Sequence, residues 1–596
     1  MSSRTLTRAA LTAVLVASGV TGAVSAAAPT GAAPTFTVRA LHFLVHVGPD
    51  RATTCDIVGD LYTPRSASST HKIPAVLTTN GFGGSKDDQQ PFAAQYAAHG
   101  YAVLSYSGLG FGGSGCPITL DDPDYDGVAG SQLVSFLGGA KGIAFTDAAH
   151  TQPVAPLDVV VRDATDHAGR ARKYDPRVGM WGGSYGGQVQ FAVASVDPRV
   201  DALVPQITWN DLSYSLNPNN TAQTSGVTTS TPGATKSTWT ALFSTLGIFD
   251  GLQYSAQDPQ RLIGCPNFAT FVCPALVAGG ATGYLPADAS TALRHASVSS
   301  YVRTIKVPTL LVQGEVDTLF NLNEASATYA ALRAQGTPVS LLWRYNGHSG
   351  GTPSAAGAAY EAGRIATWFD RYLKDKQVGT GPAFAYYRDW DGGTGVASSY
   401  PTGAARFFYL SGAGLVPKAN AVTAGSQSFV TPPAGAPTTL GGLDAVGSVA
   451  PTQLDLPNVD LPGTFARWQS PALTAPLTVV GAPTLDVRVS APVAAAQAAG
   501  PAGQLVLFAK VYDVAPDGTA APINGLVAPV RIPDVTAPVH ITLPAFAHRF
   551  ATGHSLAVVL AGGDVNYRGG LVAQPVTVST APGSTQRLTL PVVPST

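Results

Sequence analysis

The sequence predicts a mostly parallel α/β domain that carries an insertion, followed by an all-β domain of the jelly-roll or sandwich type. Between residues 73 and 343, short apolar runs alternate with helix-like segments, which is typical of a parallel sheet with helical connections. After residue 381 the helical periodicity ends, and short β-type runs are separated by Pro, Gly and Asp turns. The 596 residues suffice for two large domains, each with a full core.

Six apolar runs are the predicted strands of the α/β domain: 73–79, 101–106, 178–181, 202–207, 308–313 and 338–343. The long segment 208–304, between the fourth and fifth runs, is rich in Ser, Thr, Asn and Gly. Because long insertions in compact domains are often lids, we expect this segment to form a cap over a site. An amphipathic helix predicted over 359–376 would close a domain that spans 29–381.

The all-β domain is predicted over 382–596. Its expected strands are the runs 407–410, 477–481, 485–489, 505–512, 540–543 and 556–560. Pro516-Asp517-Gly518 predicts a turn, because proline presets φ and glycine accepts a positive φ.

Composition and charge exclude some classes of partner. Only 12% of the residues are charged, 45% are hydrophobic, and the formal net charge is −1. With no cluster of Lys and Arg, the chain is a poor candidate for binding nucleic acid or an anionic membrane. The oligomeric state stays open at this point.

The first 28 residues have the layout of a secretory signal peptide. Arg4 and Arg8 precede the apolar stretch 9–20, and small residues follow up to a predicted cleavage near Ala26. The apolar stretch has about a dozen residues, whereas a membrane-spanning helix needs about 20, so a membrane anchor is the weaker interpretation. We therefore expect a secreted protein.

The four cysteines support export. Cys55, Cys116, Cys265 and Cys273 all lie after the leader, and an even number of cysteines in an oxidising compartment predicts two disulfides. Cys265 and Cys273 would close a short loop, which leaves Cys55 with Cys116, although the sequence by itself does not prove this pairing. A zinc site is the alternative, but the chain has no Cys-x-x-Cys motif, and no metal is expected.

A Gly-x-Ser-x-Gly motif centred on Ser184 directly follows the run 178–181. Such glycines let a strand and a helix pass closely, so that the serine occupies a strained turn with its Oγ exposed. In so Gly-rich a chain the pattern alone could arise by chance. Its position between a strand and a helix predicts that Ser184 is a catalytic nucleophile.

A serine nucleophile needs a base and an acid that orients it, and in this type of domain the order is Ser, acid, His. Asp317 follows the run 308–313, and His348 follows the run 338–343, so both are expected at strand ends near Ser184. Glu315 and Glu324 compete with Asp317 for the role of the acid. Later histidines all fall in the β domain, which favours His348 as the base.

The oxyanion of such a reaction needs backbone donors. The N–H of Tyr185, directly after Ser184, is one predicted donor. The Gly-rich loop after the first predicted strand supplies the second, with the amide of Phe82 favoured and that of Gly83 next. A simple Gly-rich turn is the alternative interpretation of this loop. The predicted chemistry needs no cofactor.

An acidic stretch, Asp122 to Asp126, mimics the start of a calcium loop. Its twelfth position is Leu133, where a bidentate glutamate is required, so an EF-hand is rejected. An irregular calcium site and an acidic surface turn stay as alternatives, with the turn favoured.

Several motifs, in their order along the chain, resemble hydrolases grouped around X-Pro dipeptidyl-peptidase and bacterial cocaine esterase, the CocE/NonD family, with α-amino-acid ester hydrolases and glutaryl acylases as relatives. They are the GGSYG motif at 182–186, the run 307–314 leading into 317–320, and the segments 368–374, 407–411 and 512–518. The resemblance implies an α/β-hydrolase domain with a cap, a C-terminal jelly roll, and hydrolysis of amides or esters through an acyl-enzyme.

Two positions depart from the pattern of these relatives. Many relatives place a tyrosine, whose hydroxyl helps to bind the oxyanion, where this chain has Phe82. The family histidine often lies in a Gly-Pro-Trp-x-His-Gly context, whereas here the order is Gly347-His348-Ser349-Gly350.

The sequence thus predicts a secreted serine hydrolase, with an X-Pro dipeptidyl-peptidase first among the substrate classes. An esterase or acylase of the cocaine-esterase type is the alternative, and a catalytically idle binding protein is the rival from another class. A dipeptidyl-peptidase must also bind a free α-ammonium, usually with carboxylates. None of the aspartates of the cap segment, at 211, 250, 258 and 288, has a spacing that marks it for this role.

Overall fold

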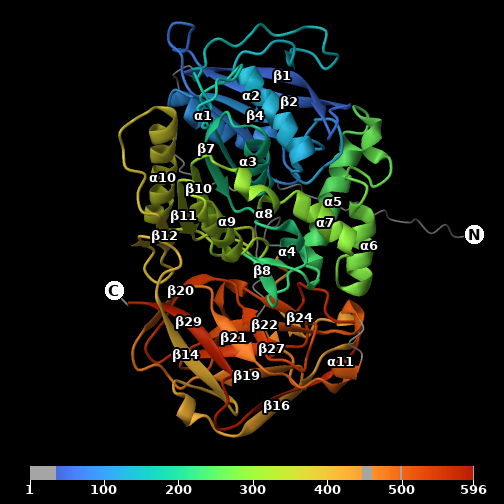
Figure 1. Ribbon diagram of the computed structural model, residues 1–596, viewed down its shortest axis with the longest axis vertical. Coiled ribbons are helices and arrows are strands. Elements are labelled where there is room, and N and C mark those ends of the chain that lie inside the picture. Colours follow the sequence, from blue (N-terminus) through green and yellow to red (C-terminus); the bar gives the residue numbers. More distant parts are fainter. Residues whose placement is uncertain (1–34, 446–458, 497–499, 595–596) are drawn as a thin grey trace, which may run out of the picture.

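The computed structural model describes residues 35–445, 459–496 and 500–594. Figure 1 shows an α/β domain above an all-β domain, with the green helices of a cap at one side. This architecture confirms the predicted fold class. The predicted leader, 1–28, lies outside the described residues.

Within the described residues, an eleven-stranded sheet forms the centre of the α/β domain, in the order β13-β12-β11-β10-β7-β6-β3-β4-β2-β1-β5. Six parallel pairings connect the seven strands from β12 to β4. The strands are β1 (Phe36–Val47), β2 (Thr53–Pro64), β3 (Ala75–Thr79), β4 (Ala102–Tyr106), β5 (Ala144–Phe145), β6 (Val178–Gly183), β7 (Val200–Gln206), β10 (Thr309–Gly314), β11 (Val339–Arg344), β12 (Phe384–Tyr387) and β13 (Thr394–Ala397).

Each of the six predicted runs overlaps one strand of this parallel core, from β3 to β11. The strands are buried along their length, as expected for a sheet with helices on both faces. The helices of this domain are α1 (Gln90–Ala98), α2 (Val128–Leu137), α3 (Tyr185–Val196), α9 (Leu322–Ala334) and α10 (Ala355–Leu373). The last of these is the helix predicted over 359–376.

Both edges of the sheet extend beyond the predicted strands. The antiparallel pair β1 and β2 lies before the first predicted run, and the alternating burial of Leu41, Phe43, Val45 and Val47 is the period-two pattern that could have revealed it. At the other edge, β12 and β13 follow residue 381 yet pair with β11. The predicted boundary at 381/382 is therefore corrected, because the first sheet continues to Ala397.

The segment between β7 and β10 contains most of the cap. It consists of α4 (Leu212–Leu216), the short strands β8 (Gln223–Ser225) and β9 (Thr228–Thr229), α5 (Ser237–Gln253), α6 (Val272–Thr282), α7 (Ala287–His295) and α8 (Val298–Tyr301). The helices α5 to α7 adjoin both domains in Figure 1.

The all-β domain contains, within the described residues, a twelve-stranded sheet and smaller strand pairs. The large sheet includes β14 (Ala404–Ser411), β15 (Gly414–Val416), β19 (Phe465–Gln469), β20 (Leu477–Gly481), β21 (Thr484–Val487), β22 (Leu505–Val514), β23 (Ala520–Pro522), β24 (Ala528–Ile532), β25 (Val539–Thr542), β26 (Phe546–Phe550), β27 (Ser555–Ala561) and β29 (Arg587–Val593). The pairs are β16 (Gly425–Val430) with β28 (Pro575–Thr580), and β17 (Thr439–Leu440) with β18 (Val459–Asp460). Gly518 has φ of +88° and turns the chain after β22, as predicted.

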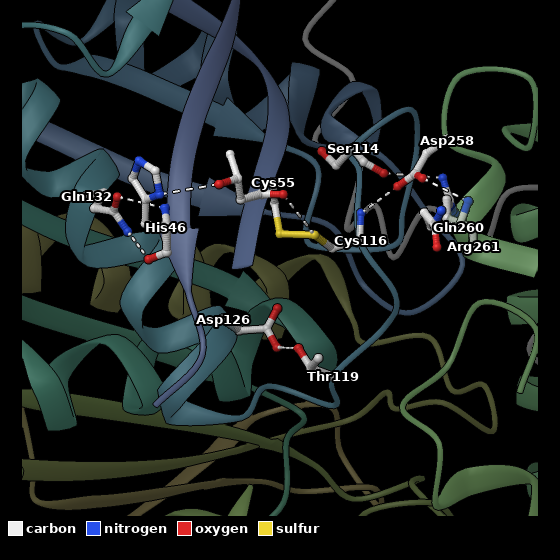
Figure 2. Close-up of a disulfide and its surroundings, with 11 residues drawn as sticks. His46, Cys55, Ser114, Cys116, Thr119, Asp126, Gln132, Asp258, Gln260 and Arg261 are labelled. Carbon is white, nitrogen blue, oxygen red and sulfur yellow. Dashed lines mark hydrogen bonds between the residues drawn. A yellow bond between two sulfur atoms is a disulfide. The ribbon is translucent and has the colours of Figure 1, made fainter. Parts of the chain in front are cut away.

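Two disulfides confirm the cysteine pairing that locality favoured, Cys55 with Cys116 and Cys265 with Cys273. Figure 2 shows that the first of them lies beside a contact with the cap, where the amide of Cys116 donates to Asp258 at 3.0 Å. Among the described residues, we find no helix with the length and apolar character needed to cross a membrane.

Candidate active site

Ser184 occupies the sharp turn between β6 and α3. Its backbone has φ of 57° and ψ of −120°, a strained conformation for a residue other than glycine. The flanking glycines make the turn possible: a Cβ at Gly186 would lie 2.5 Å from the carbonyl oxygen of Thr79, and one at Gly182 would lie 2.5 Å from that of Gly186. The sequence therefore forces the Ser184 side chain to project from the carboxyl edge of the sheet.

His348 and Asp317 reach the same edge from the loops after β11 and β10. The Nε2 atom of His348 lies 2.8 Å from the Oγ of Ser184, and its Nδ1 lies 2.8 Å from Oδ2 of Asp317. The other oxygen of Asp317 accepts hydrogen bonds from the amides of Leu319 and Phe320, at 3.1 and 2.8 Å. With Asp317 fully buried and held in this way, Nδ1 of His348 is fixed as a donor and Nε2 faces the serine as an acceptor.

The two competing acids are directed elsewhere. Glu315 accepts a hydrogen bond from the amide of Tyr387 on β12, and burial raises its pKa well above the usual range. Glu324 accepts from the amides of Asn210 and Asp211 at the base of the cap, and burial raises its pKa as well. Neither carboxyl group bonds to His348, so the geometry favours Asp317 among the three candidates.

The loop after β3 lies against the serine turn. A Cβ added to Gly81 would be 3.8 Å from the Cβ of Ser184, and Gly83 adopts a φ of +78°. Within the described residues, the amides of Phe82 and Tyr185 have no hydrogen-bond acceptor. The phenyl ring of Phe82 packs edge-on against Phe111 and Tyr185, at 5.1 and 5.9 Å between ring centroids.

An apolar pocket opens beside Ser184, with a cavity of about 90 Å³ between the sheet edge and the cap. Its walls come from the loops after β3, β7 and β10 and from the helices α4 to α7. Aromatic side chains contribute much of the surface, among them Phe82, Trp209, Phe243, Phe268 and Phe320. The sequence predicted a cap over the serine, but the spacing of these residues carried no signal that they would converge.

A buried lysine supports the loop that presents Asp317. The Nζ of Lys236, just before α5, donates to the carbonyl oxygens of Thr318 and Leu319 at 2.7 and 2.6 Å. Burial lowers the pKa of Lys236, while the negative charges of Glu324, Asp317 and Asp444 act in the opposite direction. Sequence reasoning missed Lys236, because no local pattern links it to a loop more than 80 residues away.

The acidic stretch 122–126 forms the start of a short π-helix, Pro123–Gly127, at whose N-terminus Oδ1 of Asp122 accepts from the amide of Asp124 at 2.8 Å. Asp122, Asp124 and His295 bring ligand atoms within 4.8 Å of one another at the surface. Asp126 is turned inward and bonds to the hydroxyl of Thr119 (Figure 2).

Comparisons with known protein families agree with this arrangement. The model of the X-Pro dipeptidyl-peptidase (S15) family matches residues 54–242, and that of the X-Pro dipeptidyl-peptidase C-terminal non-catalytic domain matches residues 399–582. Both models describe X-Pro dipeptidyl-peptidases, and they match in the order of the two domains of this chain. The prolyl oligopeptidase family model matches a further part of this hydrolase, residues 281–376. No curated protein sequence matches the chain.

Solved structures share the fold over nearly the whole length of this chain. An aminopeptidase from a marine sediment Thaumarchaeota archaeon aligns with a TM-score of 0.64 and 14% identity, covering 95% of this chain and 99% of its own. An α-amino acid ester hydrolase gives a TM-score of 0.63 and 15% identity, with coverages of 96% and 99%. A CocE/NonD family hydrolase from Staphylococcus aureus gives 0.57 and 14%, with coverages of 94% and 99%. At such identities the likeness concerns the fold.

Proposed function

We propose that this protein is a secreted serine hydrolase that cleaves ester or amide bonds through an acyl-enzyme. The observation that carries the proposal is the hydrogen-bonded series Ser184, His348 and Asp317 at the mouth of the pocket. A hydroxyl, an imidazole and a buried carboxylate in this order form an activated nucleophile.

In the proposed mechanism, Ser184 Oγ attacks the substrate carbonyl carbon while its proton moves to His348 Nε2. Asp317 stabilises the imidazolium that forms, and the carbonyl π electrons move to the oxygen. When the tetrahedral intermediate collapses, the bond to the leaving group breaks and His348 returns the proton to that group. Water then attacks the acyl-enzyme with His348 again as the base, which releases the acid and restores Ser184.

The amides of Tyr185 and Phe82 are proposed as the oxyanion donors. Both lack a protein acceptor within the described residues. Tyr185 directly follows Ser184, and Phe82 follows Gly81, which lies against Ser184. A preorganised donor of this kind contributes roughly 3 kcal/mol to stabilising the transition state. Because Phe82 has no hydroxyl, the loop after β3 would act through its backbone.

The description of the matched family favours an X-Pro dipeptidyl-peptidase, whereas the neutral pocket favours an esterase or acylase. Secretion is supported by the two disulfides, which persist in oxidising compartments.

The experiment compares hydrolysis of p-nitrophenyl butyrate and Ala-Pro-p-nitroanilide by the protein, with Ser184→Ala as the control. We expect turnover of the ester, loss of turnover in the control, and covalent labelling of Ser184 by an alkyl fluorophosphonate. A folded protein whose Ser184 is not labelled, and which turns over neither substrate, would contradict the proposal and leave the idle binding protein as the better interpretation.

A further inference from the structure

The pocket beside Ser184 offers a substrate no charge. Within the described residues, its lining includes no Asp, Glu, Lys, Arg or His side chain. Its two hydroxyls on α5 are already used: Thr240 donates to the carbonyl of Lys236 at 3.0 Å, and Ser244 donates to that of Thr240 at 2.5 Å. Trp209 Nε1 is buried in this lining without a partner, and it is a donor, which an ammonium group cannot satisfy.

All four aspartates of the cap segment have other roles. Asp211 pairs with Arg294 at 3.1 Å, and Asp250 pairs with the buried Arg261 at 2.9 Å. Asp258 accepts from the amides of Cys116 and Gln260. The last, Asp288, accepts from the neighbouring amide on α7.

Two buried charged side chains at the base of the cap, Lys236 and Glu324, are held by other partners. Lys236 donates to the two carbonyls that follow Asp317, and Glu324 accepts from two amides and the hydroxyl of Ser215. Each would lose established hydrogen bonds by turning toward a ligand. Within the described residues, no carboxylate is part of the lining. Asp121, whose two carboxyl oxygens are buried without a partner among these residues, follows the lining residue Leu120 but is not itself in the lining.

We infer that this pocket is an acyl-binding site for uncharged apolar acyl groups, and that it rejects acyl groups with a free α-ammonium. The inference rests on the proposed function, since it takes Ser184 as the nucleophile. It sets the substrate class apart from that of a dipeptidyl-peptidase, which must hold a charged N-terminus. An unpaired charge moved from water into such surroundings is strongly disfavoured, whereas aromatic walls gain free energy from covering an apolar group.

The test uses two methyl esters that differ in one group, 3-phenylpropanoate and phenylalaninate. They have the same carbon skeleton, and the second adds only the α-amino group. At a pH of about 6, where that group is charged, we expect kcat/KM for the neutral ester to exceed that of the charged ester by at least about tenfold. Equal values, or a preference for phenylalaninate, would overturn the inference.

A binding measurement keeps the test valid if both esters turn over slowly. The matching amides, 3-phenylpropanamide and phenylalaninamide, compete with an alkyl fluorophosphonate for Ser184, and the neutral amide should protect at the lower concentration. Better protection by phenylalaninamide would overturn the inference while leaving the proposed function intact. No labelling of Ser184 in the absence of competitor would instead refute the proposed function, and the inference with it.

A pair of variants tests whether a carboxylate in the pocket would allow a charged acyl group to bind. Ser244→Asp adds a carboxylate to the lining, and Ser244→Asn adds a neutral group of nearly the same shape. We expect the aspartate variant to shift the ratio of kcat/KM toward phenylalaninate by at least about tenfold relative to the asparagine variant. An equal ratio in the two variants would show that the ammonium does not reach this pocket and would contradict the inference.

Discussion

The cap and the β domain both contact the α/β domain, but they differ in what they present beside Ser184 and beside the loops after β10 and β12. The cap presents aromatic and aliphatic side chains to the space beside Ser184. The β domain packs apolar side chains such as Val480 and Val593 against the α/β core, and it adds hydrogen bonds and an ion pair. Asn323 on α9, for example, donates to the carbonyl of Leu543 and accepts from the amide of Ala545, at 3.1 and 3.0 Å.

Polar contacts of this kind reach the loop that carries the acid. Asn524 donates to the carbonyl of Glu315 at 3.1 Å, two residues before Asp317. Asp389, between β12 and β13, bonds to His548 of the β domain at 2.6 Å. Hydrogen bonds have strict geometry, whereas apolar contacts adapt to shape. We infer from the comparison that polar contacts with the β domain hold the loops after β10 and β12 in position, while the proposed choice among acyl groups would depend on the cap.

The largest loss of activity is expected from a change at the carboxyl edge of the sheet, where Asp317 lies. Asp317→Asn leaves the shape intact but reverses the hydrogen bond to His348 Nδ1, which favours the wrong tautomer. We expect kcat for p-nitrophenyl butyrate to fall about 10⁴-fold. Glu324→Gln is the matched control, and it should stay within about tenfold of the parent. If the control loses activity and Asp317→Asn does not, the acid is misassigned.

The next largest effect concerns the hydrogen bonds between α9 and the β domain. Asn323→Ala removes both hydrogen bonds to the β domain and leaves a buried carbonyl and a buried amide unpaired. The free energy of unfolding should fall by about 2–4 kcal/mol, with little change in the preference among acyl groups. Urea unfolding and an acyl-length series measure the two quantities. Asn420→Ala, at an exposed position, should change neither.

The ion pair between the domains predicts a pH dependence of stability. Burial lowers the pKa of His548, but its hydrogen bonds to Asp389 and Asp513 outweigh this effect and raise the pKa to about 9. The folded chain thus holds a proton that the unfolded chain releases near pH 6.5. The stabilisation is complete below pH 6.5 and is lost as the pH rises to about 9.

Replacing His548 by Asn should remove this fall, which amounts to about 2 kcal/mol over that range. Urea unfolding at pH 6.5 and 9 gives the difference. The control is His540→Asn, whose side chain is 62% exposed, and it should keep the parental slope. An unchanged slope in His548→Asn would show that the ion pair is not what couples stability to pH.

The smallest effect concerns the apolar side chains with which the cap lines the pocket. Phe243→Ala on α5 removes a ring that packs against Phe82 at 5.0 Å and enlarges the pocket. We expect kcat/KM for the butyryl ester to fall about tenfold. The ratio of kcat/KM for the octanoyl ester to that for the butyryl ester should rise. Phe249→Ala, on the same helix but outside the lining and 48% exposed, should leave the ratio of the two esters unchanged. Unchanged acyl preference in both variants would place the acyl group elsewhere.

Much of the sheet and the placement of Ser184 followed from local patterns. A short apolar run, a Gly-x-Ser-x-Gly turn and a helix are adjacent in the chain, so their geometry depends on neighbouring residues only. The same holds for the loops that end in Asp317 and His348, since parallel strands place their carboxyl ends on one edge. The sequence did not reveal that β12 and β13 belong to the first sheet, because they follow a Gly-rich segment that is typical of a domain boundary.

The sequence by itself predicted that Ser184, Asp317 and His348, in this order along the chain, lie at one edge of the sheet beside a cap, and the structure brings these three residues together. Only the tertiary structure decided between Asp317, Glu315 and Glu324, which lie within ten residues of one another yet face different partners. It also decided that the cap aspartates turn to Arg294, Arg261 and backbone amides rather than to the pocket. The physical reason is that a charge pairs with whichever partner folding brings near, and for Asp211 and Asp317 that partner is distant in sequence.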